Sequence, residues 1–366
     1  MSLFFRCVRH DKTGWLALVV LTLGLAACGG TSAPATSPSS GSAAASRTLD
    51  SAGAKPAAST AAKPSASTQS TGPGTAIKLG FSQVGVGYAP LFLAVDGGFF
   101  ARNGLDVTLQ QVAGPAAVPA LLADEVQFDG LGANELSRSV LGGAPLVGVA
   151  TLGDVPMFNL YAQAKYKTIQ DLVGQTIGVT AIGSTTDVTA RLFLDHYGLL
   201  GKINIAPAGG NVQTVLAALT QNVVQAAIIS PDNGVAAGKA GAIPIVEGAK
   251  LGVPLNFSVI AVKSTYVKDH PDTVKAFLRA YQQTWNYLGD PANKAAAIDL
   301  LAKRVQAPPE TVEAGYTPWT AVWGGQKSPT INPQGIDNIL KFADDPKARA
   351  AKGEQFVDNS ILQSLS

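Results

Sequence analysis

The sequence AIGSTTDVTARL concentrates hydroxyl groups in front of a predicted helix. Ser184, Thr185 and Thr186 precede that helix, and Asp187 lies in its first turn. The unpaired N–H groups and the positive dipole end of a helix attract anions, so hydroxyls there can hold a sulfonate, carboxylate or phosphate without a full counter-charge. The same hydroxyls also suit a simple cap of the helix, and the two roles are compatible. An Asp187 carboxylate that points towards the ligand argues against a strongly anionic one.

Two loops in the first half of the chain offer further candidate ligand contacts. SQVGVGYAP contains Gln83 and Tyr88, and Tyr88 supplies a flat ring and a hydroxyl. The alternative for Tyr88 is a ring packed at a helix start. GLGANELS places Asn134 at a helix start, where an asparagine suits both an N-cap and a ligand contact. We therefore include Gln83, Tyr88 and Asn134 among the candidate ligand-binding residues.

Two loops in the second half add to this set. ISPDNG contains Ser230 and Asp232, and the carboxylate suits either an amine on the ligand or a turn. Asn211 follows two glycines and opens a predicted helix, so its alternative role is a cap. Trp319 and Trp323 lie four residues apart on one helix face, a spacing more typical of packing than of a ligand platform. We add Ser230, Asp232 and Asn211 to the candidates.

Residues for covalent or metal chemistry are scarce in this sequence. Cys7 and Cys28 are its only cysteines, so the chain after them has no thiol nucleophile, no disulfide and no cysteine metal site. His10, His196 and His270 are far apart and form no HExxH-type spacing. GxSxG and Walker A motifs are absent. We therefore expect a protein that is not an enzyme and that uses no metal and no cofactor.

The composition bounds the size of the protein and its partners. The chain has 366 residues, of which 46% are hydrophobic and 14% are charged, and its formal net charge is +2. This length suits one large domain or two medium ones, each with its own core. Lysine and arginine are scattered, and no basic block is interleaved with aromatic residues. Nucleic acid is therefore not an expected partner.

The first 27 residues have the layout of an export signal. Arg6, Arg9, His10 and Lys12 precede an apolar run, as in a signal peptide. The run is shorter than the roughly 20 residues of a membrane-spanning helix; a span and ordinary signal cleavage are the alternatives. LAAC, which ends at Cys28, resembles the bacterial lipobox. This resemblance implies cleavage before Cys28, lipidation of its sulfur, and an exported protein anchored to the outer face of the cell membrane.

Residues 28–75 lack the composition of a folded segment. The stretches TSAPATSPSSGSAAAS and AKPAASTAAKPSASTQSTGPG consist mainly of small and polar residues with proline, and they show no apolar periodicity. Such a segment buries too little apolar surface to offset the entropy of ordering. We predict a disordered tether that holds the folded part away from the membrane surface.

Strands and helices alternate from residue 76 onwards. IKLGFSQ, LDVTLQQV, VQFDGLGA and LVGVATLG read as strands separated by helical stretches, and a similar series starts again at YKTIQDLVGQTIGVT. After Tyr266 the sequence is mostly helical. Alternation at this spacing predicts an α/β fold with mainly parallel sheets. The repeat of the pattern predicts two α/β lobes in tandem rather than one large sheet.

Several motifs, in order, resemble one protein family over residues 77–290. The sequence is similar to the periplasmic substrate-binding proteins of ABC importers in the nitrate/sulfonate/taurine and thiamine-precursor group. The resemblance rests on YAPLFLAVDGGFFARNGLDVTL, on TIQDLVGQTIGVTAIGSTT and on TVLAALTQNVVQAAIIS. The positions that match the family patterns are Ala94, Gly98, Phe99, Phe100, Gly104, Leu105, Val107, Gly114, Ala120, Leu121, Ile169, Asp171, Leu172, Gly174, Gly183 and Ser184.

Two positions in each lobe depart from the family pattern. Gln127 and Gln225 stand where the family commonly has aspartate, and Asp124 and Asn222 stand where it has glycine. In the family, that aspartate lies at the start of a strand and holds loops by hydrogen bonds. Glutamine has the same kind of acceptor, so we expect it to take over this structural role.

The resemblance implies a two-lobe, type II periplasmic-binding-protein fold with the ligand in the cleft between lobes. The expected lobes are residues 76–160 with a return at 258–366, and residues 161–257. It implies capture of a sulfonate-, nitrate- or taurine-like anion or a small heterocycle by hinge closure, and delivery to an ABC permease with its ATPase. We expect a monomer. The alternative is an enzyme or a sensor on the same fold, as in the thiamine-pyrimidine-synthase-like group.

Overall fold

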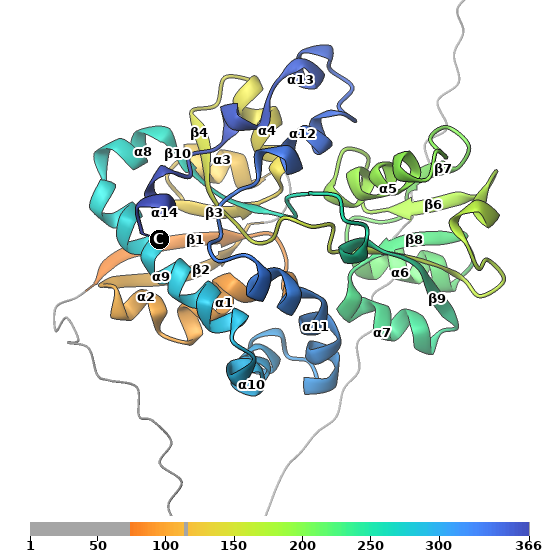
Figure 1. Ribbon diagram of the computed structural model, residues 1–366, viewed down its shortest axis with the longest axis horizontal. Helices are drawn as coiled ribbons and strands as arrows, with labels where there is room; N and C mark the ends of the chain where they lie inside the picture. The colour runs from red at the N-terminus through yellow and green to blue at the C-terminus, as the bar shows by residue number, and fades with distance from the viewer. Residues whose placement is uncertain (1–73, 113–115, 366) are drawn as a thin grey trace, which may run out of the picture. The chain divides into compact units, whose positions relative to one another are not determined.

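The computed structural model describes residues 74–112 and 116–365, which form two five-stranded sheets with helices packed around them (Figure 1). The predicted export signal, the lipidation site at Cys28 and the tether up to residue 73 lie outside the described residues. The predicted end of the tether at residue 75 is wrong by one residue, because Thr75 is the first residue of β1. Among the helices described, none has the length and apolar character needed to cross a membrane.

The first sheet has the strand order β2-β1-β3-β10-β4. β1, β2 and β3 run parallel, whereas β10 runs antiparallel to both β3 and β4. Parallel neighbours are joined here through helices, as βαβ units require. The strands are β1 (Thr75–Phe81), β2 (Leu105–Gln111), β3 (Phe128–Leu131), β4 (Leu146–Thr151) and β10 (Val259–Lys263).

The second sheet has the strand order β7-β6-β8-β5-β9. β6 pairs in parallel with β7 and β8, and β5 runs antiparallel to β8 and β9. It therefore repeats the arrangement of the first sheet, with one antiparallel strand next to the edge. The strands are β5 (Asn159–Gln163), β6 (Thr176–Val179), β7 (Asn204–Pro207), β8 (Ala226–Ile229) and β9 (Ala242–Glu247).

The α/β class is confirmed. In each sheet four strands run in one direction and one runs against them, so the sheets are mainly parallel, as predicted, but mixed. The antiparallel strands are the ones next to the crossings between the sheets. β5 is the first strand of the second sheet, and β10 is the strand by which the chain returns to the first. A strand that arrives from the other sheet enters from the opposite end, so it opposes its neighbours.

Helices cover both faces of the first sheet and continue along the C-terminal third of the chain. α1, α2 and α9 pack together on one side, while α3, α4 and α12 pack on the other. The first six helices are α1 (Ala89–Asp96), α2 (Phe99–Arg102), α3 (Ala117–Leu122), α4 (Ala133–Leu141), α5 (Thr185–His196) and α6 (Val212–Thr220). The remaining helices are α7 (Pro231–Lys239), α8 (Ser264–Asp269), α9 (Pro271–Gly289), α10 (Lys294–Val305), α11 (Pro309–Gly325), α12 (Pro333–Leu340), α13 (Pro346–Ala350) and α14 (Ser360–Ser364).

The core of the first sheet rests on closely packed aromatic rings. The ring of Phe128 in β3 stacks on that of Phe277 in α9 at a centroid distance of 3.9 Å, and Phe277 also packs against Phe100. All three side chains are fully buried. Burial of such large apolar surfaces is the main contribution that fixes α9 on the sheet. α11, in contrast, contacts both α9 and α7, so it packs on elements associated with both sheets.

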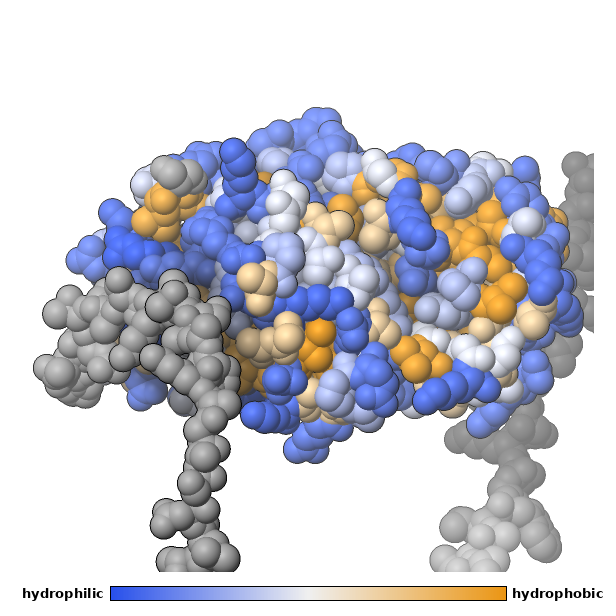
Figure 2. Space-filling view, turned by 60° about the horizontal axis from the view of Figure 1, so that its bottom comes forward, coloured by the Kyte–Doolittle hydropathy of each residue, from blue (hydrophilic) through white to orange (hydrophobic). Residues whose placement is uncertain are grey.

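The surface exposes apolar side chains unevenly. Figure 2 shows hydrophobic residues gathered over the right-hand part of the face in view, with hydrophilic residues predominating elsewhere. Of the exposed large apolar side chains, more belong to the second sheet and its helices than to the first. Those of the second sheet are Val173, Ile182, Tyr197, Leu200 and Val223.

The departure at Gln127 preserves the expected structural role. Its Oε1 accepts a hydrogen bond from the backbone N–H of Lys78 at 2.9 Å, and its Nε2 donates to the carbonyl of Asp124 at 3.1 Å. Asp124 itself has a φ of 59°, in the left-handed region where a glycine would be unstrained. The glutamine therefore holds the turn before β3 to the middle of β1.

The second sheet repeats this arrangement at Gln225. Its Oε1 accepts a hydrogen bond from the backbone N–H of Thr176, and the preceding turn contains Asn222 with a φ of 61°. Asparagine and aspartate tolerate the left-handed region better than most residues. The hydrogen-bonding role expected for the two glutamines is confirmed in both sheets.

Replacing Gly234 by alanine is expected to lower the free energy of unfolding by about 1 to 3 kcal/mol, as overpacked cores do. Gly234 is buried in α7, and a Cβ there would overlap the ring and hydroxyl of Tyr161. Gly238 in the same helix has nothing within 4 Å of an added Cβ, so Gly238→Ala should be neutral or stabilise by up to about 1 kcal/mol. Urea denaturation of both variants checks this, and equal effects would contradict the packing.

Candidate functional site

A narrow hollow lies where elements of both sheets and α11 meet. It is lined by the loop after β1, by the short 3-10 helix η1 (Val86–Tyr88), and by the first turns of α6 and α7. Gln83 follows the end of β1, and Ser230 follows the end of β8. In open α/β sheets, ligands bind beyond the carboxyl ends of the strands. Gln83 and Ser230 therefore lie beyond the carboxyl ends of β1 and β8, where a ligand is expected.

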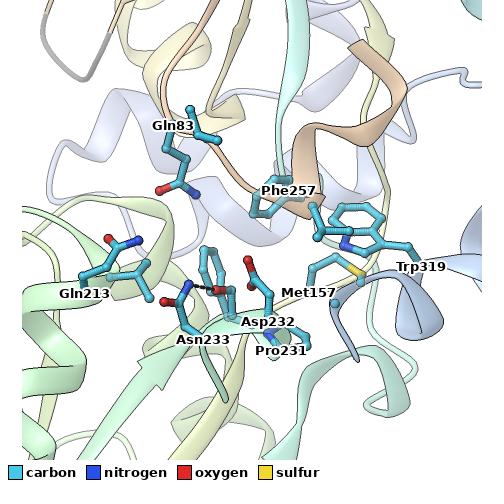
Figure 3. A pocket seen from close by; sticks show the side chains of 15 residues that line it. Gln83, Met157, Gln213, Pro231, Asp232, Asn233, Phe257 and Trp319 are labelled. Carbon is cyan, nitrogen blue, oxygen red and sulfur yellow. Dashed lines mark hydrogen bonds between the residues drawn. The ribbon is translucent and has the colours of Figure 1, made fainter. Parts of the chain in front are cut away.

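Aromatic and apolar side chains form one wall of the hollow. The rings of Phe257 and Trp319 meet edge to face at 5.4 Å, and Phe158 lies 5.5 Å from Phe257 on its other side. Trp319 stacks in turn on Trp323 at 5.6 Å. Met157 completes this wall, and Figure 3 shows it next to Trp319. The wall is almost wholly buried, so it is rigidly supported from behind.

Polar groups face that wall from α6, α7 and the loop after β1. Figure 3 shows the amides of Gln83, Gln213 and Asn233 around the same space as the Asp232 carboxylate. Asn233 Nδ2 donates a hydrogen bond to Ser230 Oγ at 2.9 Å. Ser230 and Asp232, expected on a loop, belong to the start of α7, with Ser230 as N-cap. Proline at the first position of that helix explains why the segment ISPDNG begins a helix.

The hollow is narrow. It leaves about 30 Å³ of free space for the centres of water-sized molecules, which is room for about two waters. An organic solute needs a pocket of several hundred Å³. Binding therefore requires the elements on its two sides to separate, and a solute once enclosed would be shielded from water.

The hydroxyl cluster at the start of α5 does not line this hollow. Ser184 is the N-cap, and its Oγ accepts from the N–H of Asp187. Thr186 is buried, and its Oγ1 accepts from the N–H of Thr180 at 2.9 Å. Ser184 and Thr186 also bond to each other at 2.9 Å. The predicted cap is thus confirmed, and a ligand role for Ser184, Thr185 and Thr186 stays a prediction.

Asn134 and Thr185 instead connect the two sheets' helices. Asn134 Nδ2 donates to the carbonyl of Gly183 at 2.6 Å, and Thr185 Oγ1 lies 3.5 Å from Asn134 Oδ1. The N-cap of α4 is Gly132 rather than Asn134, and Glu135 Oε2 accepts a hydrogen bond from the backbone N–H of Gly132 at 2.9 Å. Nearby, Lys341 pairs with Asp195 of α5. The Asn134 contacts join α4 to the start of α5, and the Lys341–Asp195 pair joins the end of α12 to the end of α5.

Replacing Asn134 by alanine is expected to shift the protein towards a more open arrangement. The variant loses a hydrogen bond between α4 and the loop before α5, worth about 1 kcal/mol, which corresponds to a factor of about five in an open–closed equilibrium. Small-angle scattering of the unliganded protein should show a larger radius of gyration. Ser139→Ala is the control, since Ser139 Oγ bonds only within α4, to the Glu135 carbonyl. An unchanged radius for Asn134→Ala would contradict the bridging role.

Tyr88 and Asn211 have structural partners of their own. Tyr88 is buried, its hydroxyl donates to the Gly130 carbonyl at 3.1 Å and bonds Ser82 at 2.6 Å, and burial raises its pKa to about 12. Asn211 is exposed and caps α6, because its Oδ1 accepts from the N–H of Thr214 at 2.9 Å. The predicted packing of Tyr88 and cap by Asn211 are confirmed. Their ligand roles stay predictions, and neither lines the hollow.

A buried carboxyl lies in β3, apart from the hollow. Asp129 is fully buried, and neither of its carboxyl oxygens has a hydrogen-bond partner. Burial raises its pKa to about 7, and the nearby charge of Glu135 adds to the shift. Burial also raises the pKa of Glu135. Over residues 74–112 and 116–365, no group of three or more His, Cys, Asp or Glu side chains gathers where it could hold a metal ion.

The wall residues Met157, Phe158 and Phe257 are the functional candidates that sequence reasoning missed. They lie in the two segments that cross between the sheets, before β5 and before β10. Met157 and Phe158 lie in a stretch without strand or helix periodicity, and Phe257 opens FSVIAVKS, which reads as a strand, so all three look like ordinary core residues. Trp319 is visible from its spacing, but that spacing favours packing. The packing is confirmed, since Trp319 is 2% exposed and stacks on Trp323. It also lines the hollow, so a ligand contact by Trp319 stays a prediction.

Sequence comparison gives a family match. A model described as "NMT1/THI5 like" matches residues 86–294, more than half of the chain. The match begins at η1 and takes in every strand from β2 to β10. A curated protein of Haemophilus influenzae, whose name connects it with thiamine biosynthesis, is 27% identical over 221 residues, which cover 57% of this chain and 67% of that protein.

Solved structures share the two-sheet architecture. The ligand-binding component of an ABC-type import system from Staphylococcus aureus, solved with zinc bound, has a TM-score of 0.67 and 15% identity and covers 80% of this chain and 99% of its own. The alkanesulfonate-binding protein SsuA from Xanthomonas axonopodis, bound to MOPS, has a TM-score of 0.58 and 19% sequence identity. The match covers 80% of this chain and 98% of that protein. The periplasmic nitrate-binding protein NrtA from Synechocystis has a TM-score of 0.62 and 15% sequence identity. The match covers 80% of this chain and 88% of that protein. These likenesses show the periplasmic-binding-protein type II fold.

Proposed function

The chain belongs to the NMT1/THI5-like family, and from that premise we propose that it captures a small organic solute in the hollow and delivers it to an ABC permease. The observation that carries the proposal is the hollow itself. It joins the carboxyl ends of β1 and β8 to an aromatic wall and a set of amides. A few polar groups placed on a mainly apolar, concave surface are typical of small-molecule sites.

The names of similar proteins suggest the class of solute. Structures with this fold are named for alkanesulfonate and nitrate binding, and a sequence relative for thiamine biosynthesis. We therefore propose a sulfonate-, nitrate- or taurine-like anion or a small heterocycle, released unchanged to the permease. The hollow supports binding rather than turnover, because its lining holds a carboxylate, amides, a hydroxyl and aromatic rings but no histidine or cysteine among the described residues.

Hinge closure is the proposed mechanism of capture. The two sheets are joined by the segments before β5 and before β10, which suits lobes at residues 76–160 with 258–366 and at 161–257. The small free space of the hollow supports this mechanism, since a solute enters only when the lobes separate. Contacts such as Asn134 to Gly183 favour the closed arrangement. A bound solute adds contacts to both lobes and shifts the equilibrium further towards it.

We propose that the protein works outside the cell membrane as a monomer. The sequence around Cys28 supports export and lipid anchoring, and structures of similar fold are named as periplasmic binding proteins. The tether of residues 28–75 would let the folded part reach the permease while keeping it near the membrane. Globomycin treatment of expressing bacteria tests the anchor: the unprocessed chain should accumulate, and unchanged processing would contradict it.

Ligand-dependent thermal stabilisation tests the proposed binding. The full chain, purified in detergent, is screened against sulfonates, nitrate, pyrimidines, flavins, amines and aromatic carboxylates. A ligand at 100 times its Kd stabilises the folded state by about 2.7 kcal/mol, which should raise Tm by about 5 °C for a chain of this size. A complete blank across a broad metabolite library would count against a solute-binding function.

A further inference from the structure

One negative charge stands alone in the hollow. Asp232 is the only ionisable residue among the described residues that line it, and no lysine, arginine or histidine faces it there. We propose that the solute carries a protonated amine that pairs with the Asp232 carboxylate. This inference rests on the proposed capture of a small organic solute, and among the proposed classes it favours an amine-bearing heterocycle over a simple anion. The solute is then an organic cation with an aromatic or other apolar body.

The surroundings of Asp232 hold its carboxylate in place for such a pair. It lies in the first turn of α7, directly after Pro231, and is partly buried. A Cβ added at Gly315 would lie 2.9 Å from the Cβ of Asp232, and one added at Gly85 would lie 3.6 Å from its Oδ2. Gly315 in α11 thus leaves the room that the Asp232 side chain occupies, and Gly85 before η1 lies beside its carboxylate at ordinary van der Waals distance.

The oxygens of the Asp232 carboxylate are available to accept hydrogen bonds or to form an ion pair with a ligand. None of the hydrogen bonds or ion pairs found among the described residues involves its oxygens, and Figure 3 shows it directed into the space between Asn233 and Met157. A carboxylate that is charged, partly desolvated and without a protein partner is satisfied best by a cationic group on the ligand.

The wall opposite Asp232 suits the rest of a cationic solute. Phe257 and Trp319 present aromatic surface, and a cation held near an aromatic ring gains attraction from the ring electrons. Met157 adds a polarisable, adaptable contact. The amides of Gln83 and Asn233 offer both hydrogen-bond donors and acceptors. They can orient any polar atoms that the solute carries besides its amine.

A sulfonate or nitrate finds no equivalent partner in the hollow. Its charge would approach the Asp232 carboxylate without a nearby cation to offset the repulsion. The amides of Gln83, Gln213 and Asn233 can donate to an anion, but neutral donors do not cancel a like charge in a partly dehydrated site. The second group of hydroxyls, at Ser184 and Thr186, is already bonded within its own cap.

The test compares three matched sets of probes on the full chain in detergent at pH 7. Arylalkyl amines, alcohols and sulfonates of the same carbon skeletons, such as benzylamine, benzyl alcohol and phenylmethanesulfonate, are titrated by calorimetry. The amines should bind at least tenfold more tightly than the alcohols, and the sulfonates more weakly than either. Sulfonates that bind as tightly as the amines, or alcohols that match them, would overturn the inference while leaving a binding function in place.

Paired variants separate a ligand contact from a structural role. Asp232→Asn should weaken amine binding at least tenfold and leave alcohol binding within twofold. Asp272→Asn is the matched control, because Asp272 also follows a proline in the first turn of a helix, α9, but is exposed and does not line the hollow. It should leave amine binding unchanged. Amine affinity that survives Asp232→Asn overturns the inference, and so does a blank for all three probe sets, whereas the proposed function falls only with a blank in the broad thermal-stabilisation screen.

Discussion

Replacement of Trp319 by alanine is expected to lower the free energy of unfolding by about 3 to 5 kcal/mol, the range for buried large-to-small changes, and to weaken solute binding at least tenfold. Trp319 is 2% exposed, stacks on Trp323 and meets Phe257 edge to face. A Cβ at Gly153 would overlap the Trp319 ring, so the ring fills the space beside that glycine. Urea denaturation and calorimetry of the purified variant measure the two effects.

Trp285→Ala is the matched control for this prediction. Trp285 is fully buried in α9, and its Nε1 donates to the Gln326 carbonyl at 2.7 Å, but it does not line the hollow. It should lose as much stability as Trp319→Ala while binding solute normally at temperatures where it is folded. An equal loss of affinity in both variants would mean that Trp319 acts on binding only through stability.

Asp129→Asn is expected to stabilise the protein at alkaline pH and to flatten its pH dependence. Burial raises the pKa of Asp129 from an ordinary value of 3.8 to about 7 in the folded state. Between these values the folded state holds a proton that the unfolded state has released, so stability falls as pH rises through this window and levels off above pH 7. This residue alone should lower the free energy of unfolding by about 2 to 3 kcal/mol between pH 5 and pH 8.

The measurement is urea denaturation of the parent and the variant at pH 5 and pH 8. The amide that replaces the carboxyl has no charge to bury, so the variant should gain stability over the parent chiefly at pH 8. Asp106→Asn, at an exposed position on β2 of the same sheet, is the control and should keep the parent's pH dependence. If Asp129→Asn keeps the parent's full loss of stability between pH 5 and pH 8, the buried carboxyl is not its source.

The alternation of elements is predictable from the sequence because apolar periodicity and glycine or proline punctuation are local signals. Strand direction is not local. Whether β5 and β10 run parallel or antiparallel depends on the end from which the chain enters each sheet, and nothing within NLYAQ or VIAVK encodes that. The mixed sheets therefore follow from the two crossings between lobes, which only the three-dimensional path reveals.

In the candidate site, the position of a residue after a strand is predictable from the sequence, whereas the hydrogen-bond partners of its side chain are not. Gln83, Ser230 and Asp232 are predictable because each follows a strand whose carboxyl end faces the hollow. Ser184 also follows a strand, β6, but its hydroxyl is used by the cap and by Thr186. Sequence shows that a hydroxyl is present at a helix start. It does not show whether that hydroxyl is free for a ligand or already bonded.

The aromatic wall illustrates a further limit. Phe158 and Phe257 come from segments about a hundred residues apart in the chain, and each lies just outside a strand. Their contact depends on the two crossings lying side by side. A single sequence gives no signal for such a contact, although it correctly predicts that Trp319 and Trp323 share a helix face.

Hydrogen exchange of the full chain, with and without the solute that stabilises it most, tests the central claim most directly. A solute held in the hollow between the lobes should slow exchange in three segments that are distant in sequence, residues 83–88, 230–233 and 315–319, and should be recovered unchanged afterwards. Protection confined to residues 180–187, or no protection despite saturable binding, would contradict the placement of the site. Recovery of a chemically altered solute would contradict the assignment as a binding protein.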